Sequence, residues 1–151
     1  MKKLLAILML GLSPLLLASD FGQHLLIENN FVIHPITEYE KTHTNDVYHF
    51  YIRNDIKQVG PKQFLVHTMV EYILEDGIKY AELGYSVKRI YNYGMLDCDL
   101  KAFSLTSDVY VDEKNKIVYS ESYELGEFVA ELTTPNTARN SVYKKVCFNS
   151  V

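Results

Sequence analysis

The sequence predicts an α+β domain in which an antiparallel sheet precedes a single helix that packs on one of its faces. Three observations lead to this class. Apolar and polar residues alternate along several long stretches, turn signals separate those stretches, and only the last segment changes to a helical period. Once the predicted export signal is removed, about 130 residues remain, enough for one domain with its own core.

The first 19 residues have the layout of a secretory signal peptide. Two lysines precede an apolar run over residues 4–12, and a second apolar run ends at Ala18. We therefore expect a signal peptide over residues 1–19 and a mature domain over residues 20–151. The apolar run is too short for a transmembrane helix, so we expect no stable membrane span after cleavage. Asp20 stands where a lipoprotein would carry its lipid-bearing cysteine.

The N-terminal part of the mature chain predicts an edge strand, a loop and a longer strand. Phe31–Ile33 is an apolar run before Pro35, and proline is tolerated at the edge of a sheet but not at its centre. The polar stretch Lys41–Asp46 predicts a loop. Val47–Arg53 predicts the next strand, which Asn54-Asp55 closes.

The central part of the chain predicts two long strands. Phe64–Leu74 alternates with period two over its whole length, between the turn signals Gly60-Pro61 and Asp76-Gly77. Tyr85–Leu96 is rich in tyrosine and β-branched residues, which favour strands. Gly94 in this second strand indicates a bulge.

A hairpin follows. Apolar residues alternate along Phe103–Val111, and Glu113–Lys116 forms the turn into Ile117–Tyr123. Phe128–Ala130 predicts a further short strand at an edge of the sheet.

The closing segment predicts a helix over residues 135–148. Thr134 is a suitable N-cap, and Pro135 would occupy the first helical position, where its missing N–H costs nothing. Ala138, Val142 and Val146 then recur every four residues, so they would face the sheet.

Cys98 and Cys147 are the two cysteines of the chain. Export places both in an oxidising compartment, where such a pair forms a disulfide. Cys98 ends a predicted strand, and Cys147 lies in the last turn of the predicted helix. A Cys98–Cys147 disulfide would therefore fix the helix to the sheet.

The charge of the chain excludes several partners. The formal net charge is −4, and removal of the signal peptide takes two lysines and no acid, which gives −4 − 2 = −6. Nucleic acid, heparin and anionic lipid require a basic surface, so we expect none of them as partner. The absence of tryptophan and the 12 tyrosines fit a half-buried sheet face or a binding surface.

No motif for catalysis, a cofactor or a metal is recognisable. The histidines, His24, His34, His43, His49 and His67, lack the spacing of metal ligands. The strand serines, Ser104, Ser107 and Ser120, lie in no nucleophile elbow, and no glycine-rich phosphate loop is present. We therefore expect a non-enzymatic protein without cofactor or metal.

One strand suggests a protein-binding surface. Tyr85, Tyr91 and Tyr93 share one parity on the strand that also carries Lys88 and Arg89. Because a single helix covers only one face of a sheet, the opposite face must be solvated, bound to a protein partner or paired in a homodimer.

Three segments resemble the surface-adhesin protein E family of Gram-negative bacteria. The segment YNYGMLDCDLKAFSLTSDVYVDE (residues 91–113) is similar to the central part of that family, and FVAELTTPNTARNSVYKKVC (128–147) to its closing element. The stretch VYHFYIRNDIKQVGPKQFLVHTMVEYIL (47–74) also fits. The resemblance implies a single antiparallel sheet of about six strands, with the helix tethered by the disulfide.

The resemblance also implies a function. Members of this family bind host matrix and serum proteins at the outer envelope without catalysis, so the chain would be an exported adhesin-like protein in the periplasm or at the cell surface. Since this chain lacks the lipid-bearing cysteine of the adhesin, the alternative is a periplasmic structural or accessory protein that binds an envelope protein.

Overall fold

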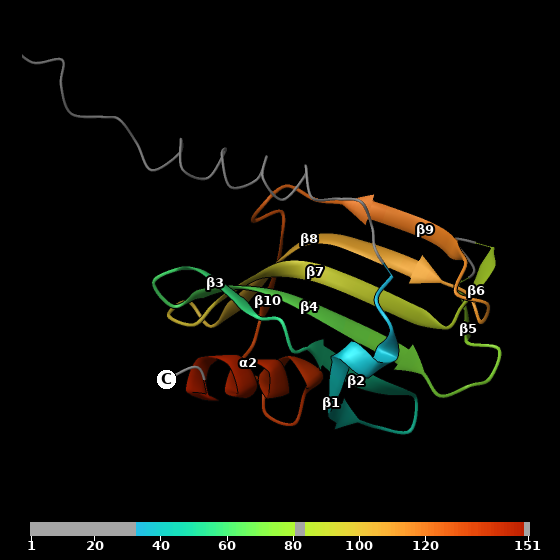
Figure 1. Cartoon of the computed structure of the whole chain (residues 1–151), viewed down its shortest axis with the longest axis horizontal. Helices are drawn as coiled ribbons and strands as arrows, with labels where there is room; N and C mark the ends of the chain where they lie inside the picture. The colour runs from blue at the N-terminus through green and yellow to red at the C-terminus, as the bar shows by residue number, and fades with distance from the viewer. Residues whose placement is uncertain (1–32, 81–83, 150–151) are drawn as a thin grey trace, which may run out of the picture. The chain divides into compact units, whose positions relative to one another are not determined.

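An antiparallel sheet with one helix on one of its faces forms the body of the protein, seen here in a computed structural model (Figure 1). The structure describes residues 33–80 and 84–149. The predicted signal peptide, its boundary at residue 19, and Phe31 and Val32 lie outside the described residues. Every described residue belongs to the unit Phe31–Val151.

Ten strands, a short 3₁₀ helix and one α-helix are present in the described ranges. They are η1 (Ile36–Glu38), β1 (Tyr39–Thr44), β2 (Tyr48–Arg53), β3 (Lys57–Gly60), β4 (Gln63–Tyr72), β5 (Ile78–Tyr80), β6 (Tyr85–Val87), β7 (Arg89–Asp97), β8 (Ala102–Val111), β9 (Ile117–Ser122), β10 (Phe128–Glu131) and α2 (Ala138–Asn149).

The main sheet has eight strands, of which six lie side by side in the order β1-β2-β4-β7-β8-β10. β3 pairs with the same side of β4 as β2, and β9 pairs with the same side of β8 as β10. The α+β class and the antiparallel pairing are therefore confirmed. The strands outnumber the expected six because β3 pairs beside β2 and β9 beside β10, and because β5 and β6 form a separate two-stranded sheet.

The predicted single strand Tyr85–Leu96 is wrong, since the chain divides at Lys88 into β6 and β7. The N–H of Lys88 donates to the carbonyl of Val111 over 2.7 Å, and its carbonyl accepts from the N–H of Tyr72 over 3.0 Å. These bonds hold Lys88 at the point where the small sheet joins the main one.

The N-terminal expectations were also partly wrong. Residues 41–44, predicted as a loop, belong to β1 and pair with β2. Ile33, the described member of the predicted strand Phe31–Ile33, lies in no strand. An edge strand with one face in water has no strict apolar alternation, so its polar sequence resembles that of a loop.

We call the face of the sheet that carries α2 the helix face. One half of it, the stapled half, has an apolar core between the sheet and α2. Its buried residues are Phe50, Ile52, Phe64, Val66, Leu96, Leu132, Ala138, Val142 and Val146. The inward positions predicted for the helix are thus confirmed.

The other half of the helix face, the tyrosine half, is packed under the β5–β6 sheet. Tyr72, Val87 and Ile90 are its buried residues, with Tyr80 and Tyr110 packed against them. Tyr48 and Val70 touch the cores of both halves, which makes the helix face continuous.

Gly94 lies at an irregularity of the β7–β8 pairing, as predicted. The register shifts between Tyr93 and Gly94, and the extra residue is Thr106 on the partner strand. A Cβ at Gly94 would lie 2.4 Å from the carbonyl oxygen of Ser104 and 2.5 Å from the ring of Phe103. Only glycine lets the two strands approach this closely.

The helix begins at Ala138, three residues later than predicted. Asn136 has a φ of 59°, a left-handed conformation that cannot continue a helix. Thr137 is the N-cap in place of the predicted Thr134, because its Oγ1 accepts a 3.1 Å hydrogen bond from the N–H of Asn140.

The Cys98–Cys147 disulfide is confirmed, with 5.7 Å between the two Cα atoms. It joins Cys98, the residue after β7, to Cys147 in the last turn of α2. Both half-cystines pack against the core of the stapled half. No helix in the described part of the chain has the length and apolarity needed to span a membrane.

The opposite face of the sheet carries a second apolar core. Its buried members are Tyr39, Tyr51, Met69, Tyr91, Val109 and Val111, with Ile33 and Tyr93 packed against them. Ile33 and Tyr39 come from the chain around η1, so this segment covers part of the face that the sequence left to solvent or a partner.

Candidate protein-binding sites

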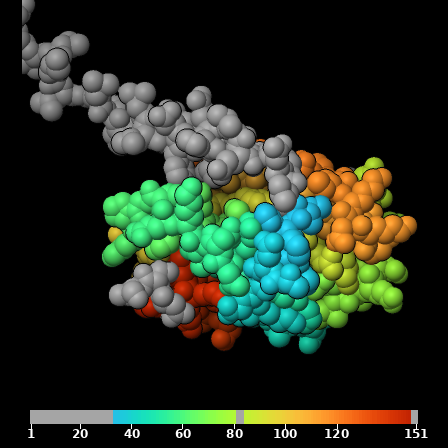
Figure 2. Space-filling model, in the orientation of Figure 1, coloured from blue at the N-terminus to red at the C-terminus, as the bar shows by residue number. Residues whose placement is uncertain are grey.

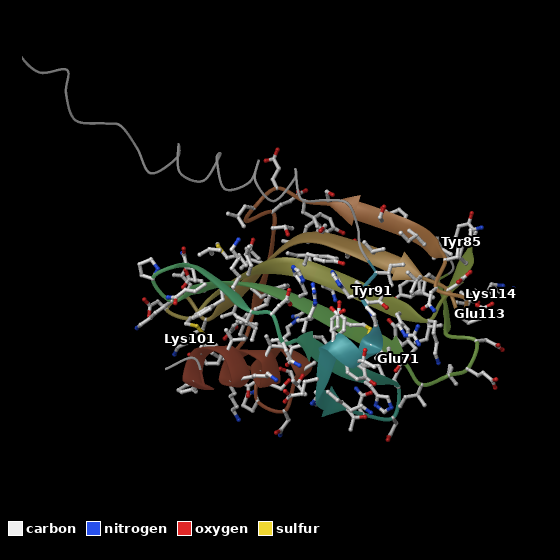
Figure 3. The ribbon with its side chains drawn as sticks, viewed as in Figure 1. Glu71, Tyr85, Tyr91, Lys101, Glu113 and Lys114 are labelled. Carbon is white, nitrogen blue, oxygen red and sulfur yellow. A yellow bond between two sulfur atoms is a disulfide. The ribbon has the colours of Figure 1, made fainter. Side chains whose placement is uncertain are left out.

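The five residues predicted to bind a protein do not form one surface. Tyr85 is 56% exposed and lies on β6, opposite Tyr80 of the small sheet. Lys88 is half-buried, and its Nζ donates to the carbonyl of Leu74 over 2.7 Å. Figure 3 shows Tyr85 at the end of the protein, away from Tyr91 in the sheet.

Arg89, Tyr91 and Tyr93 share the opposite face of β7. The guanidinium of Arg89 donates to Glu71 through Nε over 2.9 Å, and its second nitrogen lies 2.7 Å from the same oxygen. Tyr91 is 2% exposed and packs edge-on against Tyr39. A side chain this buried can support a binding surface but cannot touch a partner.

Glu71 orders a polar strip beside this second core. The hydroxyl of Tyr51 donates to its second oxygen over 3.1 Å. Burial and then the Glu71 carboxylate raise the pKa of Tyr51 to about 12. Arg89 and Tyr51 both bind the Glu71 carboxylate, so the charges of Arg89 and Glu71 are paired.

A second polar group, which the sequence did not indicate, gathers around Arg53. Its guanidinium lies 3.0 Å from Glu38 and 3.1 Å from Asp55, and it contacts the rings of His34 and His67. Within residues 33–80 and 84–149, no three histidine, cysteine or acidic side chains are placed to hold a metal ion.

The tyrosine half contains a cluster of acids and tyrosines. Asp108 on β8 faces Glu121 on β9. Asp108 accepts a 3.0 Å hydrogen bond from Tyr110, and Glu121 accepts one of 2.8 Å from Tyr119. The hydroxyl of Tyr123 lies 3.2 Å from Asp108 and 3.1 Å from Glu121. The Tyr123 hydroxyl thus lies between two acids on adjacent strands, and each acid also accepts from a tyrosine of its own strand.

The surroundings of Asp108 in this cluster shift its pKa. Burial raises the pKa of Asp108, and the hydrogen bonds from Tyr110 and Tyr123 oppose that rise without cancelling it. The alternating spacing Asp108-x-Tyr110 and Tyr119-x-Glu121-x-Tyr123 places all five side chains on one face of two paired strands. That spacing is the sequence signal that could have revealed the cluster.

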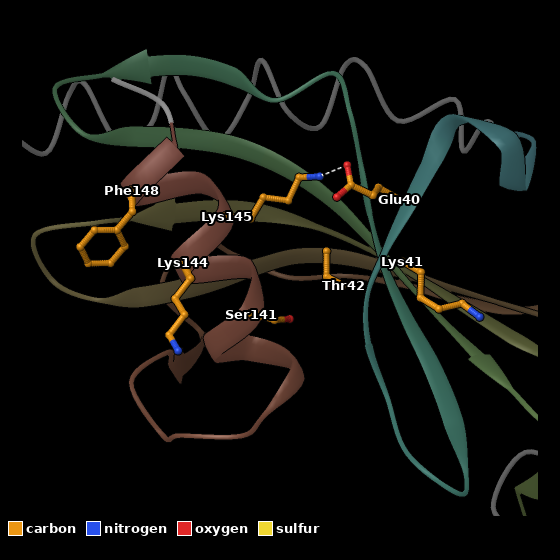
Figure 4. A pocket seen from close by; sticks show the side chains of 7 residues that line it. All are labelled: Glu40, Lys41, Thr42, Ser141, Lys144, Lys145 and Phe148. Carbon is orange, nitrogen blue, oxygen red and sulfur yellow. Dashed lines mark ion pairs between the residues drawn. The ribbon is translucent and has the colours of Figure 1, made fainter.

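A groove lies between β1 and α2. Its volume is about 820 Å³, and its walls are Glu40, Lys41, Thr42, Ser141, Lys144, Lys145 and Phe148 (Figure 4). The atoms of α2 and of β1 meet on the surface shown in red and blue-green in Figure 2. The helical residues recur at intervals of three and four, so a single face of α2 forms one wall.

The groove combines positive charge with an exposed ring. Its lining has three lysines and one glutamate, a formal charge of 3 − 1 = +2 on a chain whose net charge is −4. Lys145 forms an ion pair with Glu40, whereas no acidic side chain in the described ranges pairs with Lys144. Phe148 is 65% exposed beside it.

Lys41 belongs to the groove through its backbone. Its ammonium lies on the other side of β1, 5.5 Å from the centre of the Tyr51 ring. Figure 4 shows the Lys41 side chain directed away from α2 and that of Lys144 extending from the helix. Cations therefore stand on both sides of the β1 edge.

Comparison with known proteins gives a likeness of fold. No protein-family model and no curated protein sequence match this chain. The crystal structure of protein E from non-typeable Haemophilus influenzae matches it with a TM-score of 0.50 and 16% identity, over 79% of this chain and 80% of that chain. Crystal form II of Haemophilus influenzae protein E gives a TM-score of 0.48 and 16% identity, over 72% of this chain and 92% of that chain.

At this identity the first match supports a shared fold and nothing finer. The arrangement expected from the resemblance to the protein E family, a sheet closed by a disulfide-tethered helix, is confirmed at that level. The binding residues of the chain have to be argued from its own geometry.

Proposed function

We propose that this chain is an exported, non-enzymatic protein-binding domain of the adhesin type, which contacts matrix or serum proteins of a host. The signal-like first 19 residues and the protein E-like fold support the exported location and the class. The observation that carries the proposal is the groove between β1 and α2, where unpaired positive charge and an exposed phenyl ring lie beside the edge of a sheet.

Aromatic side chains are enriched in protein-binding surfaces, and a charged patch attracts a partner of opposite charge. Tyr85 and Lys88 form a second contact surface in this proposal, because they are the accessible members of the set predicted from the sequence. Arg89 and Tyr93 lie on the opposite face of β7 and would form a separate contact there, and Tyr91 would hold their strand in place.

Capture of soluble proteins tests the role. The full chain, exported by a Gram-negative host and purified from its envelope, is immobilised and exposed to matrix and serum proteins. The proposal expects saturable binding of at least one of them, and weaker binding after Lys144→Glu or Lys88→Glu. Lys114→Glu, on the exposed β8–β9 turn beside Tyr85 and away from the groove, is the charge-matched control for Lys144→Glu and should reduce binding less (Figure 3).

Protease treatment of intact cells tests the location. Cleavage of the chain by external protease supports display at the cell surface and hence the adhesin role. Complete protection, together with an absence of captured host proteins, would overturn that role in favour of a periplasmic accessory protein.

A further inference from the structure

We propose that the groove between β1 and α2 holds an extended acidic peptide segment of a partner protein, which pairs with the backbone of β1 at Lys41. The inference rests on the protein-binding role proposed above and names the chemistry of the partner. It is carried by the hydrogen-bonding pattern of β1 and by the charges around the groove.

The outer edge of β1 offers unpaired backbone groups. The N–H of Asn54 donates to the carbonyl of Glu38, which makes these residues a hydrogen-bonded pair of the β1–β2 ladder. Because antiparallel pairs alternate, Glu40 and Ile52 are the next hydrogen-bonded pair, and the backbone of Lys41 points away from β2. In the main sheet, β1 pairs with β2 alone.

The same pattern sets the extent of the pairing. The N–H of Tyr39 is already used, since it donates to the carbonyl of Ile36. The register shift between Lys41 and His43 interrupts the edge at Thr42. A partner strand would therefore pair with both backbone groups of Lys41 and with the carbonyl of Tyr39, so the docked segment is short.

The two sides of β1 select the side chains of that segment. Side chains of an added strand alternate between the α2 side and the far side. On the α2 side they would meet the Lys144 ammonium and the Phe148 ring, and on the far side the Lys41 ammonium. Carboxylates therefore fit on both sides, with one apolar side chain over Phe148.

A second copy of this chain fits the groove less well. Residues directly opposite each other in an antiparallel strand pair share a face, so a second β1 would place its Lys41 beside the first on the far side. Like charges in close contact weaken association. An acidic segment from another protein neutralises the formal +2 of the lining instead. We therefore assign the groove to an acidic partner segment.

Fluorescence anisotropy with the full exported chain tests this inference. The probes are two labelled peptides, one of alternating glutamate and valine and one of alternating lysine and valine. We expect binding of the acidic peptide alone, with an affinity reduced about tenfold by Lys144→Glu. Lys114→Glu again serves as the charge-matched control.

A proline at position 41 tests the backbone contact itself. Lys41→Pro removes an N–H that points away from β2, so it should leave β1 in place on an edge where proline is tolerated. It should abolish peptide binding, whereas Lys41→Ala should weaken it only partly. An unchanged melting temperature of the Lys41→Pro protein verifies that the fold persists.

The outcomes separate this inference from the proposed function. Equal binding of both peptides, or full binding by the Lys41→Pro protein, would overturn the inference. So would self-association in sedimentation analysis that Lys41→Pro abolishes, since a second copy would then occupy the groove. Host-protein capture that survives Lys41→Pro and Lys144→Glu would leave the binding role intact and refute the peptide groove alone.

Discussion

The two halves of the helix face are closed by different chemistry. In the stapled half, α2 buries apolar side chains against the sheet, and the Cys98–Cys147 disulfide fixes it there. In the tyrosine half, the β5–β6 sheet packs on Tyr72 and Ile90 through its own Val87, and tyrosine hydroxyls donate to two acids on β8 and β9. The first half has a covalent and apolar closure, whereas the second depends on hydrogen bonds and therefore on pH.

This difference bears on function. The groove has one wall on α2 and one on β1, so the disulfide and the apolar core that hold α2 also hold the candidate binding site. A change in the tyrosine half should affect stability without altering the groove.

Loss of the disulfide should have the largest effect. The bridge closes a loop with a sequence separation of 49 residues, and a cross-link of that length contributes about 4 kcal/mol in the chain-entropy model. We expect the Cys98→Ser, Cys147→Ser double variant to lose about that much in urea unfolding. An unfolding midpoint equal to that of the oxidised protein would show that the core alone holds α2.

Truncation of a core side chain in the stapled half comes next. Leu96 is fully buried against α2, so Leu96→Ala should reduce the free energy of unfolding by about 3 kcal/mol. Leu100→Ala is the matched control, because Leu100 is 75% exposed. Similar losses for both leucines would contradict the proposed apolar closure.

Removal of one hydroxyl in the tyrosine half should cost less. Tyr123→Phe deletes the group that bridges Asp108 and Glu121 and should reduce the free energy of unfolding by about 1 kcal/mol. Tyr85→Phe, at an exposed position, should change it little. If the two variants are equally stable, the hydroxyl does not stabilise the acid pair.

The smallest expected effects are on how the free energy of unfolding depends on pH, and they differ between the stapled half and the tyrosine half. Burial would raise the pKa of Asp97, but hydrogen bonds from the Leu100 N–H, the Gln63 amide and the Asp99 N–H outweigh it and lower that pKa from 3.8. Asp97, beside the disulfide, therefore adds stability above the pKa of the unfolded chain, and this is lost as the pH falls through the folded value.

The pKa of Asp108 shifts in the opposite direction, so Asp108 has the opposite effect on stability. Its pKa is raised from 3.8, so the folded protein retains a proton that the unfolded chain releases, and stability falls as the pH rises from 3.8 to the folded value. In urea unfolding at a series of pH values, Asp108→Asn should remove this fall and Asp97→Asn should remove the loss in acid. The same pH response in both variants would refute the assignment.

The sequence predicted the regular parts of this fold better than its edges. The alternation along Phe64–Leu74 and the four-residue period of the helix identified β4 and α2, because both elements bury one face. β1 was missed since its sequence, Tyr39–Thr44, lies at an edge and mixes polar residues on both faces. The start of α2 depends on the backbone of Asn136, which composition does not reveal.

The candidate site was harder to predict. The groove brings Lys41 and Lys144, more than a hundred positions apart, to the two sides of one strand edge through the pairing of β1 and the tether of α2. Tyr91 was predicted as a contact residue because alternation along its strand places it on the sheet face that the helix does not cover. Alternation does not tell whether another segment covers that face. Here Tyr39 packs on it.

The most direct test of the account is an NMR titration of the oxidised, isotope-labelled protein with the glutamate–valine peptide. The account predicts chemical-shift changes at the amides of Lys41, Ser141, Lys144 and Phe148, with those of Tyr110 and Tyr119 unmoved. Shifts concentrated in the tyrosine half, or no shifts at saturating peptide, would contradict it.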